Sequence, residues 1–479
     1  MKPEDSPQRR AEPNRQRPAA SFSTSVSMPG GGAEGGRTEH ATELQEEPEP
    51  LDLFERVLSR ENMVMAWQQV KANRGAAGVD GMTIDDFPEF ARENWERIRE
   101  ELQAGRYRPQ AVRRVLIPKA SGGKRPLGIA SVVDRVIQQA IAQVLSPIYE
   151  PEFSESSYGF RPGRSAHDAI RVVEQGYKEG YREAVDCDLK SFFDTVNHDY
   201  LMYRLGEKVK DKRLLALIGK FLRAGVQLPN GDRKPTPEGV PQGSPLSPLL
   251  ANVLLDELDK ELERRGHRFA RYADDFIILV RSRWAASRVM KSITRFVEER
   301  LKLVVNAEKS RCAKLIHCSF LGFFISRGKV KWTEKSLQAF KARIRKITKR
   351  SWGVSMKHRL EELRRYMIGW INYYGISQSY GDVLALDQWI RRRVRLCYWK
   401  MWKRPRKRRK MLLKLGIDPE EVHLASRSRK GYWRMSTNSL VQRALTNVWL
   451  ESQGVPSLRT RWIAIHYPDQ TAKGGSVRN

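Results

Sequence analysis

The chain has few of the residues that build disulfide frameworks or zinc sites. Its four cysteines, Cys187, Cys312, Cys318 and Cys397, are spread over 479 residues, and no two of them form a Cys-x-x-Cys pair. Eight scattered histidines do not complete a metal-ligand pattern. The sequence therefore supports neither a disulfide-stapled secreted fold nor a zinc-bearing nuclease module.

Long apolar runs are also missing. No stretch approaches the roughly 18 apolar residues that a membrane-spanning helix requires, and no signal-peptide core is visible near the N-terminus. We therefore expect no membrane partner and a cytoplasmic location.

Acidic residues are too few to balance the basic ones. The chain has 87 Lys and Arg against 56 Asp and Glu, which gives a formal net charge of +31. The excess is uneven, because residues 1–50 sum to −3 whereas residues 341–479 sum to +23. A basic excess of this size indicates a polyanionic partner, and nucleic acid is the first candidate.

Patterning divides the chain into four parts. Residues 1–50 are rich in Pro, Gly, Ser and Glu and lack an apolar period, so a disordered tail is expected. Residues 51–333 mix strand and helix patterns and predict an α+β region. In residues 334–425 apolar side chains recur at helical spacing, which predicts a separate helical region. Residues 426–479 form a small basic region with fewer clear periods.

Several elements of the α+β region can be placed from these patterns. The run Ser247-Pro248 predicts a helix start, with Ser as the cap and Pro in the first turn. The other expected elements are helices over 53–73, 88–104 and 131–145, a β-hairpin from 113–119 and 124–129, and a strand that runs into a turn over 185–193.

Two adjacent carboxylates, Asp274 and Asp275, lie between apolar, β-prone runs in residues 268–280. This pattern predicts a β-hairpin whose tip presents the acids. An ordinary acidic turn is one interpretation, and a Mg²⁺ site for a nucleoside triphosphate is the other.

A polymerase site of this kind needs a third carboxylate on a neighbouring strand, because one metal activates the primer 3′-hydroxyl while the other holds the triphosphate. Asp188 is the best candidate, since it lies in an apolar-flanked strand. Asp186, as a strand-edge acid, and Asp194, as a turn acid, are the alternatives.

The most basic stretch is Arg391 to Lys410, which contains 12 Lys and Arg and no acids. Tyr398, Trp399 and Trp402 lie among these cations. Basic side chains interleaved with aromatic rings suit a phosphate backbone and unstacked bases, so an RNA-binding surface is expected. A disordered basic run is the alternative.

The order of motifs resembles that of reverse transcriptases. These motifs are Asp188–Phe193, Pro241–Pro245, Tyr272–Asp275, Lys309 and Phe320–Phe323. In addition, Lys124–Gly128 and Tyr158–Arg164 resemble the group II intron-encoded branch, and Trp370–Gly375 resembles the maturase region of that branch, also called domain X or thumb. The likeness covers about residues 51–470.

The resemblance implies a right-hand polymerase fold, with fingers and palm in 51–333. An all-helical thumb or maturase domain would occupy 334–425, followed by a DNA-binding-like region in 426–479. Asp188, Asp274 and Asp275 would be the catalytic acids and the ligands of two Mg²⁺ ions, which in such sites lie about 3.5–4 Å apart.

The resemblance also implies contacts to the incoming dNTP from Lys119, Arg125, Phe193, Gln242 and Lys309. The two cations of the hairpin would close over the triphosphate, the Phe193 ring would exclude a 2′-hydroxyl, and Lys309 would contact the triphosphate or protonate pyrophosphate. The alternatives are a solvated basic hairpin, a core aromatic residue, a helix-entry loop at Gln242 and a surface lysine.

Contacts to primer, template and RNA are expected from a wider set. Gly243 would permit close backbone approach to the nascent base pair, and the turn at Phe320 and Gly322 matches the primer grip, although alone it would be interpreted as core. The full set is Tyr158, Arg161, Arg164, Gly243, Phe320, Gly322, Arg391, Arg392, Arg395 and Arg406.

The expected function is that of an RNA-directed DNA polymerase that copies intron RNA into cDNA and, as a maturase, assists group II intron splicing and mobility. Its partners would be the intron RNA, a DNA primer or target and dNTPs, at the nucleoid of a bacterium. No H-N-H endonuclease with Cys pairs is visible, so we expect priming from existing 3′ ends. The alternatives are an intron-independent reverse transcriptase of defence or repair, a splicing-only RNA-binding maturase, and an RNA-dependent RNA polymerase, which Phe193 disfavours.

Overall fold

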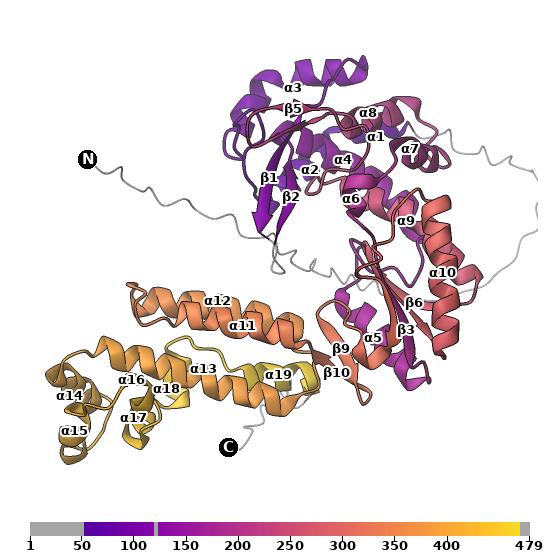
Figure 1. Cartoon of the computed structure of the whole chain (residues 1–479). Coiled ribbons are helices and arrows are strands. Elements are labelled where there is room, and N and C mark those ends of the chain that lie inside the picture. Colours follow the sequence, from indigo (N-terminus) through magenta and orange to yellow (C-terminus); the bar gives the residue numbers. More distant parts are fainter. Residues whose placement is uncertain (1–51, 119–122, 470–479) are drawn as a thin grey trace, which may run out of the picture. The chain divides into compact units, whose positions relative to one another are not determined.

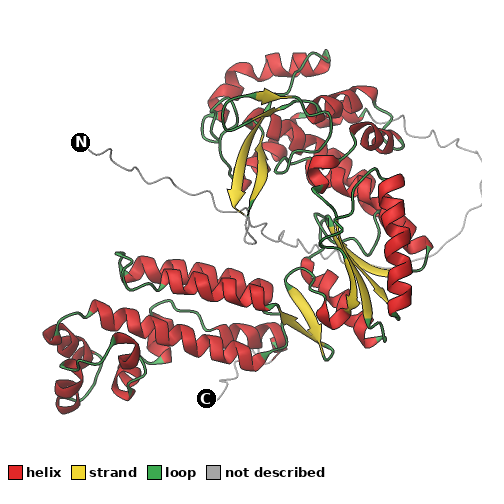
Figure 2. Ribbon diagram, viewed as in Figure 1, coloured by secondary structure: helices red, strands yellow, loops and turns green. Residues whose placement is uncertain are grey.

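The computed structural model describes residues 52–118 and 123–469. The predicted tail over 1–50 and Lys119 lie outside the described residues. Helices predominate, with short strands between them (Figure 2), and this mixture confirms the α+β class. None of the described helices combines the length and the apolar character that a membrane span requires.

Two compact units divide the described chain. The first contains the described residues up to Ala169 together with Val185–Ile278 and Trp284–Cys312. The second contains Ile170–Ala184, Leu279–Arg283 and the described residues from Ala313 onward.

The first unit begins with four helices, of which α4 is the most buried. They are α1 (Leu53–Leu58), α2 (Arg60–Asn73), α3 (Phe87–Gln103) and α4 (Val132–Tyr149). The single helix expected over 53–73 is two helices, because Ser59 adopts an extended conformation and its hydroxyl accepts a hydrogen bond from the Asn62 N–H. Ser59 therefore ends α1 and caps α2.

A four-stranded sheet in the first unit contains the predicted hairpin. β1 (Val112–Pro118) pairs antiparallel with β2 (Lys124–Ile129), in register from Arg113 opposite Ile129 to Pro118 opposite Lys124. The two-residue strands β4 (Val226–Gln227) and β5 (Arg233–Lys234) extend the sheet in the order β2-β1-β4-β5. Figure 1 labels β1, β2 and β5 of this sheet.

Helix α9 (Ser247–Arg264) begins one residue earlier than the predicted cap implies. Ser247 is its first residue rather than its N-cap, and the Ser247 hydroxyl donates to the carbonyl oxygen of Pro241. The remaining short and long helices up to residue 299 are η1 (Glu150–Glu152), α5 (Ala166–Lys178), α6 (Phe192–Thr195), α7 (His198–Gly206), α8 (Lys212–Leu222) and α10 (Arg283–Glu299).

A second four-stranded sheet has the order β6-β7-β3-β8. Its strands are β6 (Arg268–Tyr272), β7 (Asp275–Val280), β3 (Glu183–Asp188) and β8 (Arg311–Lys314). The hairpin predicted over 268–280 is confirmed. Phe276 to Val280 are all buried, which explains why this strand is continuously apolar rather than alternating.

The second unit is mainly helical, with one separate hairpin besides the end residues of β3, β7 and β8. That hairpin pairs β9 (Phe323–Ser326) with β10 (Lys329–Trp332). A core of Trp332, Phe340, Leu363, Trp399 and neighbouring side chains holds the helices together. The remaining elements are η2 (Leu315–His317), α11 (Glu334–Ile347), α12 (Met356–Tyr374), α13 (Tyr380–Met401), α14 (Pro405–Lys414), α15 (Pro419–Ser426), α16 (Tyr432–Met435), α17 (Ser439–Ala444), α18 (Asn447–Ser452) and α19 (Leu458–His466).

Candidate active site

The three predicted catalytic acids lie at the ends of adjacent strands. Asp188 is the last residue of β3, and the turn from β6 to β7 presents Asp274 and begins β7 with Asp275. Strands β3 and β7 are neighbours in the sheet. The fold therefore brings together carboxylates that are 86 positions or more apart in the sequence.

The acids share one electrostatic environment. Burial, and after it the charges of Asp186, Asp274 and Asp188, raise the pKa of Asp275 to about 7. Burial also raises the pKa of Asp274, although the Arg125 guanidinium opposes this increase. A divalent cation would relieve this repulsion, and carboxylate oxygens are the ligands that Mg²⁺ prefers. The chemistry of the donor set fits a magnesium site.

Asp188 is held by the segment that follows α10. The Asn306 amide donates to Asp188 Oδ2 at 2.9 Å, and Lys309 Nζ lies 3.1 Å from the same oxygen. The Asp188 N–H donates to Ser310 Oγ, and the Asn306 N–H donates to the Asp188 carbonyl oxygen. Within the described ranges, no three His, Cys, Asp or Glu side chains form a ready-made metal site. The fit of the three acids to Mg²⁺ therefore rests on their chemistry, and Asp188 is paired with the Lys309 ammonium.

Sequence reasoning missed the two polar partners Asn306 and Ser310. Their only signal is their closeness to Lys309, since the pairing of this turn with β3 is a long-range contact. Asp186, the alternative third acid, is half-buried and bonded to Arg311 at 3.3 Å. The charge of Asp186 therefore helps to raise the pKa of Asp275, while Asp186 itself is paired with Arg311.

The predicted dNTP contacts Arg125 and Gln242 touch each other. Arg125 Nε donates to Gln242 Oε1 at 2.6 Å, and the Gly128 N–H donates to the Gln242 carbonyl oxygen at 2.8 Å. Gly243 has φ of +112°, and a Cβ there would lie 2.8 Å from the Gly128 carbonyl oxygen. Only glycine fits this approach, so the hairpin and the loop form one surface.

Phe193 is anchored from the same loop. It lies on α6 with its ring edge-on to Phe192, and 7% of the residue is exposed compared with 2% for Phe192. The Val240 N–H donates to the Phe193 carbonyl oxygen at 2.6 Å. A Cβ on Gly239 would lie 3.0 Å from that oxygen. The position of Phe193 thus depends on the chain just before Gln242.

The structure corrects the expectation that Arg161 contacts nucleic acid. Its side chain is buried, and its guanidinium donates to Glu150 Oε1, to the Ser154 carbonyl oxygen and to the Ser157 carbonyl oxygen. Arg161 therefore braces its own loop. Tyr158 in that loop is also buried, with 8% exposed. Arg164 is half-buried and donates to the carbonyl and carboxylate oxygens of Glu155.

The structure also corrects the expectation that the first half of the basic stretch from Arg391 to Lys410 binds RNA. Arg391 is buried against Asp387 and Glu451, and Arg395 donates to the Leu445 carbonyl oxygen and to Asn447 Oδ1. These arginines join α13 to α17 and α18. The aromatic residues expected to stack on bases form the core of the second unit; they are Tyr398, Trp399 and Trp402.

Arg392 lies over the ring of Trp433, 3.7 Å from its centroid, and is half-buried. Arg406, by contrast, is exposed near the start of α14. Since α14 is an ordered helix, a disordered basic run is also wrong. The cations that remain available to a polyanion lie mainly after Trp402; they are Lys403, Arg404, Arg406, Lys407, Arg409 and Lys410.

The predicted primer-grip turn is braced by the helices of the second unit. Phe320 and Phe323 exchange backbone hydrogen bonds at 2.9 Å, with Leu321 and Gly322 both at positive φ. The Tyr373 hydroxyl donates to the Leu321 carbonyl oxygen at 2.9 Å. Phe320 itself is buried.

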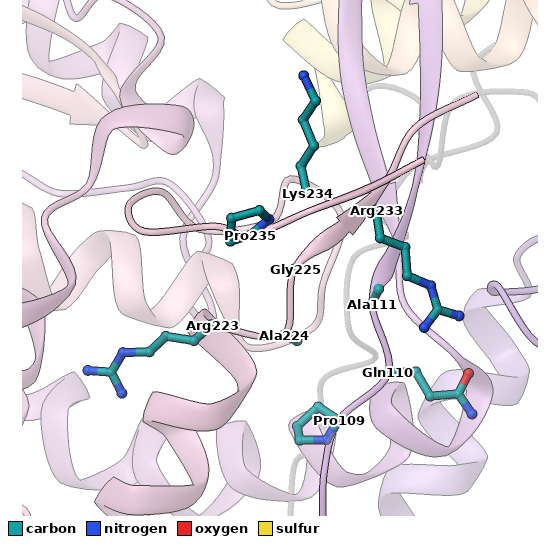
Figure 3. Close-up of a pocket in the computed structure, with 9 residues that line it drawn as sticks. All are labelled: Pro109, Gln110, Ala111, Arg223, Ala224, Gly225, Arg233, Lys234 and Pro235. Carbon is teal, nitrogen blue, oxygen red and sulfur yellow. The ribbon is translucent and has the colours of Figure 1, made fainter. Parts of the chain in front are cut away.

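A cavity of about 460 Å³ opens beside β4 and β5, and none of the three predicted catalytic acids lines it. Arg223, Arg233 and Lys234 contribute to its lining. Figure 3 shows these three cations pointing in different directions, with Arg223 and Lys234 diverging. They do not converge on a single anion.

Two family models match the chain. The model described as "Reverse transcriptase (RNA-dependent DNA polymerase)" matches residues 117–325, and "Group II intron, maturase-specific domain" matches residues 337–416. Among solved structures, a partial Cas6-RT-Cas1–Cas2 complex has a chain that is 26% identical, with a TM-score of 0.34, over 52% of this chain and 43% of that one. Telomerase from Candida albicans is 13% identical, with a TM-score of 0.38, over 65% and 63%.

Curated relatives agree with the family models. Protein YkfC of Escherichia coli is 34% identical, over 54% of this chain and 77% of that protein. The group II intron-encoded protein LtrA of Lactococcus lactis is 36% identical, over 54% of this chain, and the match spans 42% of its own length. The chain belongs to the family of group II intron-encoded reverse transcriptases with a maturase-specific domain.

Proposed function

We propose that the chain is a metal-dependent RNA-directed DNA polymerase whose palm acids are Asp188, Asp274 and Asp275. Reverse transcriptases generally use divalent metal ions at the palm. The observation that carries the proposal is the half-buried acid cluster at the ends of β3 and β7, where burial and repulsion raise the pKa of Asp275 to about 7. A carboxylate perturbed so strongly beside other acids indicates a functional site.

In the proposed reaction the primer 3′-oxygen attacks the α-phosphate of a dNTP. A P–O bond to the primer forms, the P–O bond to pyrophosphate breaks, and the hydroxyl proton leaves to solvent. When bound, two Mg²⁺ ions supply the Lewis-acid chemistry that activates the hydroxyl and stabilises pyrophosphate. Asp188, Asp274 and Asp275 would hold these ions.

The surrounding cations and the Phe193 ring complete the site. Arg125, together with Lys119, which lies outside the described residues, would neutralise the triphosphate. The bond from Arg125 to Gln242 links this cation to the loop that faces the nascent base pair. Phe193, fixed by Val240, excludes the 2′-hydroxyl and selects dNTPs. Lys309, which pairs with Asp188, would contact the triphosphate or protonate pyrophosphate.

Primer extension tests the polymerase directly. Purified chain is incubated with an RNA template, an annealed DNA primer, dNTPs and Mg²⁺, and product length is followed in time. The parent should extend the primer, and chelation of the metal should stop extension. A matched variant, Asp85→Asn, changes an exposed acid outside the site and should extend normally. Extension that persists in excess chelator would contradict the metal assignment.

The second unit supports a maturase role in which the protein supplies binding energy and charge neutralisation to the intron RNA. Its exposed cations around α14 are suited to phosphates, and its buried aromatics give a rigid platform for them. We infer a cytoplasmic, nucleoid-associated protein. Crosslinking in cells and sequencing of the bound RNA should recover a group II intron. RNA without a ribozyme-like domain V hairpin would favour an intron-independent reverse transcriptase instead.

A further inference from the structure

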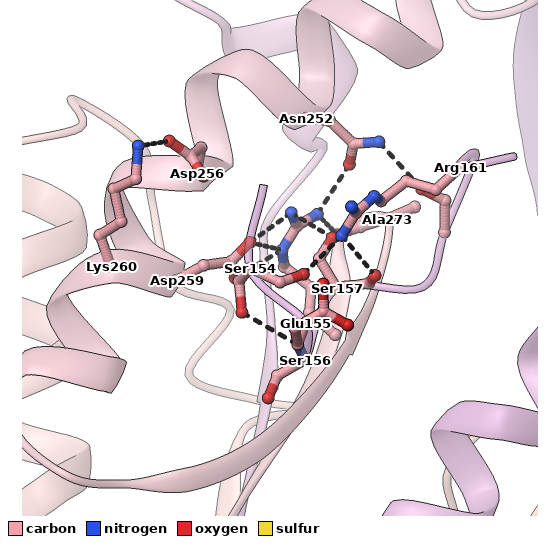
Figure 4. Close-up of polar contacts among 12 residues, drawn as sticks. Ser154, Glu155, Ser156, Ser157, Arg161, Asn252, Asp256, Asp259, Lys260 and Ala273 are labelled. Carbon is pink, nitrogen blue, oxygen red and sulfur yellow. Dashed lines mark hydrogen bonds and ion pairs between the residues drawn. The ribbon is translucent and has the colours of Figure 1, made fainter. Parts of the chain in front are cut away.

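One buried arginine lies directly behind the turn that presents the acids. Arg271 belongs to β6 and is fully buried, as is its ion-pair partner Asp259 on α9. Arg271 Nε donates to Asp259 Oδ1 at 2.7 Å, and Nη2 lies 2.5 Å from Oδ2. Figure 4 shows Asp259 and Asn252 reaching this network from the same helix.

Every N–H of the Arg271 guanidinium has a partner. Besides Asp259, Nη2 donates to Ser157 Oγ at 2.7 Å, and Nη1 donates to Asn252 Oδ1 at 3.0 Å and to the Ala273 carbonyl oxygen at 3.0 Å. A guanidinium offers five donors in a fixed fork, and this fork is fully used. The bond to Ala273 fixes the peptide that leads into Asp274.

The same turn has an unfavourable backbone conformation. Ala273 has φ of +59°, a left-handed value that carries a steric cost for an L-residue. Such conformations persist where the surrounding structure over-determines them, and they cluster at functional sites. The Ala273 carbonyl oxygen, held by Arg271, is part of that surrounding structure.

The opposite side of the turn is also constrained through Arg271. Its N–H donates to the Ser156 carbonyl oxygen, and its own carbonyl oxygen accepts from the Tyr158 N–H. This pairing brings Gly159 so close that a Cβ there would lie 2.2 Å from the Ala273 nitrogen. Asn252 closes the ring, because its amide donates to the Gly159 carbonyl oxygen at 2.9 Å.

Stability alone is a poor reason for this arrangement. A fully buried ion pair gives little net stabilisation compared with apolar residues of similar volume, because both charges lose their hydration. Its benefit is directional: a planar fork can hold a carboxylate, a side-chain amide and a main-chain carbonyl at fixed angles at once. The main-chain group that it holds is one residue from the metal-binding acids.

We propose that Arg271, oriented by Asp259 and Asn252, is the positioning residue that sets the Ala273–Asp274 peptide and so aims Asp274 and Asp275 at the metals. This inference rests on the proposed function, since it assumes that these acids bind metal. It assigns to Arg271 an effect on metal affinity and on kcat, rather than on binding of the nucleotide.

The test compares Arg271→Lys with a matched control, Arg135→Lys, in the full chain. Lysine keeps the buried positive charge for Asp259 but cannot reproduce the fork. Arg135 is also a buried arginine of the first unit, and it donates to the main-chain carbonyl oxygen of Ala76 rather than to the acid turn. The readouts are Mn²⁺ affinity, measured by electron paramagnetic resonance of the free ion, and kcat and KM for dNTP.

Arg271→Lys should weaken Mn²⁺ binding about 10–100-fold, as expected when the groups that orient metal ligands are changed. Its kcat should fall about 100-fold, as for a misplacement near 1 Å, with KM for dNTP little changed. The control should keep both values. Mn²⁺ affinity and kcat that stay within threefold of the control would overturn the positioning role.

A second variant covers the case in which Arg271→Lys does not fold. Asn252→Ala leaves the Arg271–Asp259 pair intact but removes one of the two partners of Nη1 and the bond to the Gly159 carbonyl oxygen. It should weaken Mn²⁺ binding in the same direction, and unchanged binding would refute the proposal. Asp274→Ala serves as the reference variant, because it lacks one of the proposed metal ligands. If the parent and Asp274→Ala bind Mn²⁺ equally, the metal assignment itself fails, and the positioning role fails with it.

Discussion

Replacing Asp275 by asparagine should change how stability depends on pH. The pKa of Asp275 is raised from an ordinary value of 3.8 to about 7 by burial and by three neighbouring carboxylates. Between about pH 4 and pH 7 the unfolded chain has lost this proton while the native state keeps it. Stability contributed by the protonated group is therefore present at low pH and is lost as pH rises towards 7.

The size of the effect follows from the shift. Each pKa unit corresponds to about 1.36 kcal/mol, so about three units give about 4 kcal/mol in total. About 3 kcal/mol of this falls between pH 4.5 and pH 7.5. Asp275→Asn removes the titrating group. The free energy of unfolding of the variant minus that of the parent should therefore rise by about 3 kcal/mol over this range.

The assay is urea-dependent hydrogen exchange of α9, which reports the first unit alone, without divalent ions. Parent and Asp275→Asn are compared at each pH, so that the intrinsic exchange chemistry cancels. Asp85→Asn, which alters an exposed acid, should show a flat difference. A difference between parent and Asp275→Asn that changes by less than about 0.5 kcal/mol from pH 4.5 to 7.5 would refute the assignment of Asp275 as a buried, repelled carboxylate.

Two further predictions concern the nucleotide side of the site. Phe193→Ala should raise ribonucleotide incorporation in primer extension with mixed dNTP and rNTP pools, because the ring that excludes a 2′-hydroxyl is gone. Unchanged discrimination between dNTPs and rNTPs would show that Phe193 is only a core aromatic residue. Lys309→Gln should strengthen Mn²⁺ binding without dNTP by less than about 1 kcal/mol, since the ammonium that competes for Asp188 is removed and the pair is exposed. Weaker Mn²⁺ binding in this variant would show that Lys309 helps to shape the metal site.

Local patterns were sufficient for the acid hairpin. Residues 268–280 combine two apolar runs with a polar tip, and short-range alternation and turn chemistry determine such a hairpin without help from the rest of the chain. The α+β class and the helical second half were predictable for the same reason. Ser59 is a small exception, because its extended conformation divides one apolar period into two helices.

Long-range partners explain what the sequence did not reveal. In the sequence, Arg271 is only a charged residue next to the Tyr272–Asp275 motif. Its role becomes visible in the structure, where Asp259 and Asn252 of α9 bind its guanidinium. Arg391 and Arg395 resemble surface cations because acids are absent from residues 391–410. Asp387 lies one turn earlier on α13, at the i,i+4 spacing that a helical pattern does indicate. Glu451 and Asn447 come from α18, and no periodicity predicts these long-range partners.

The most direct test of the account measures two activities of the Asp274→Ala chain in one preparation. RNA-templated cDNA synthesis should fall about 100-fold or more, since a ligand of the metals that stabilise the transition state is lost. Splicing of the bound intron RNA should continue at the parental rate, because the protein contributes only binding to that step. Parental cDNA synthesis by a folded Asp274→Ala chain would contradict the assignment of the palm acids.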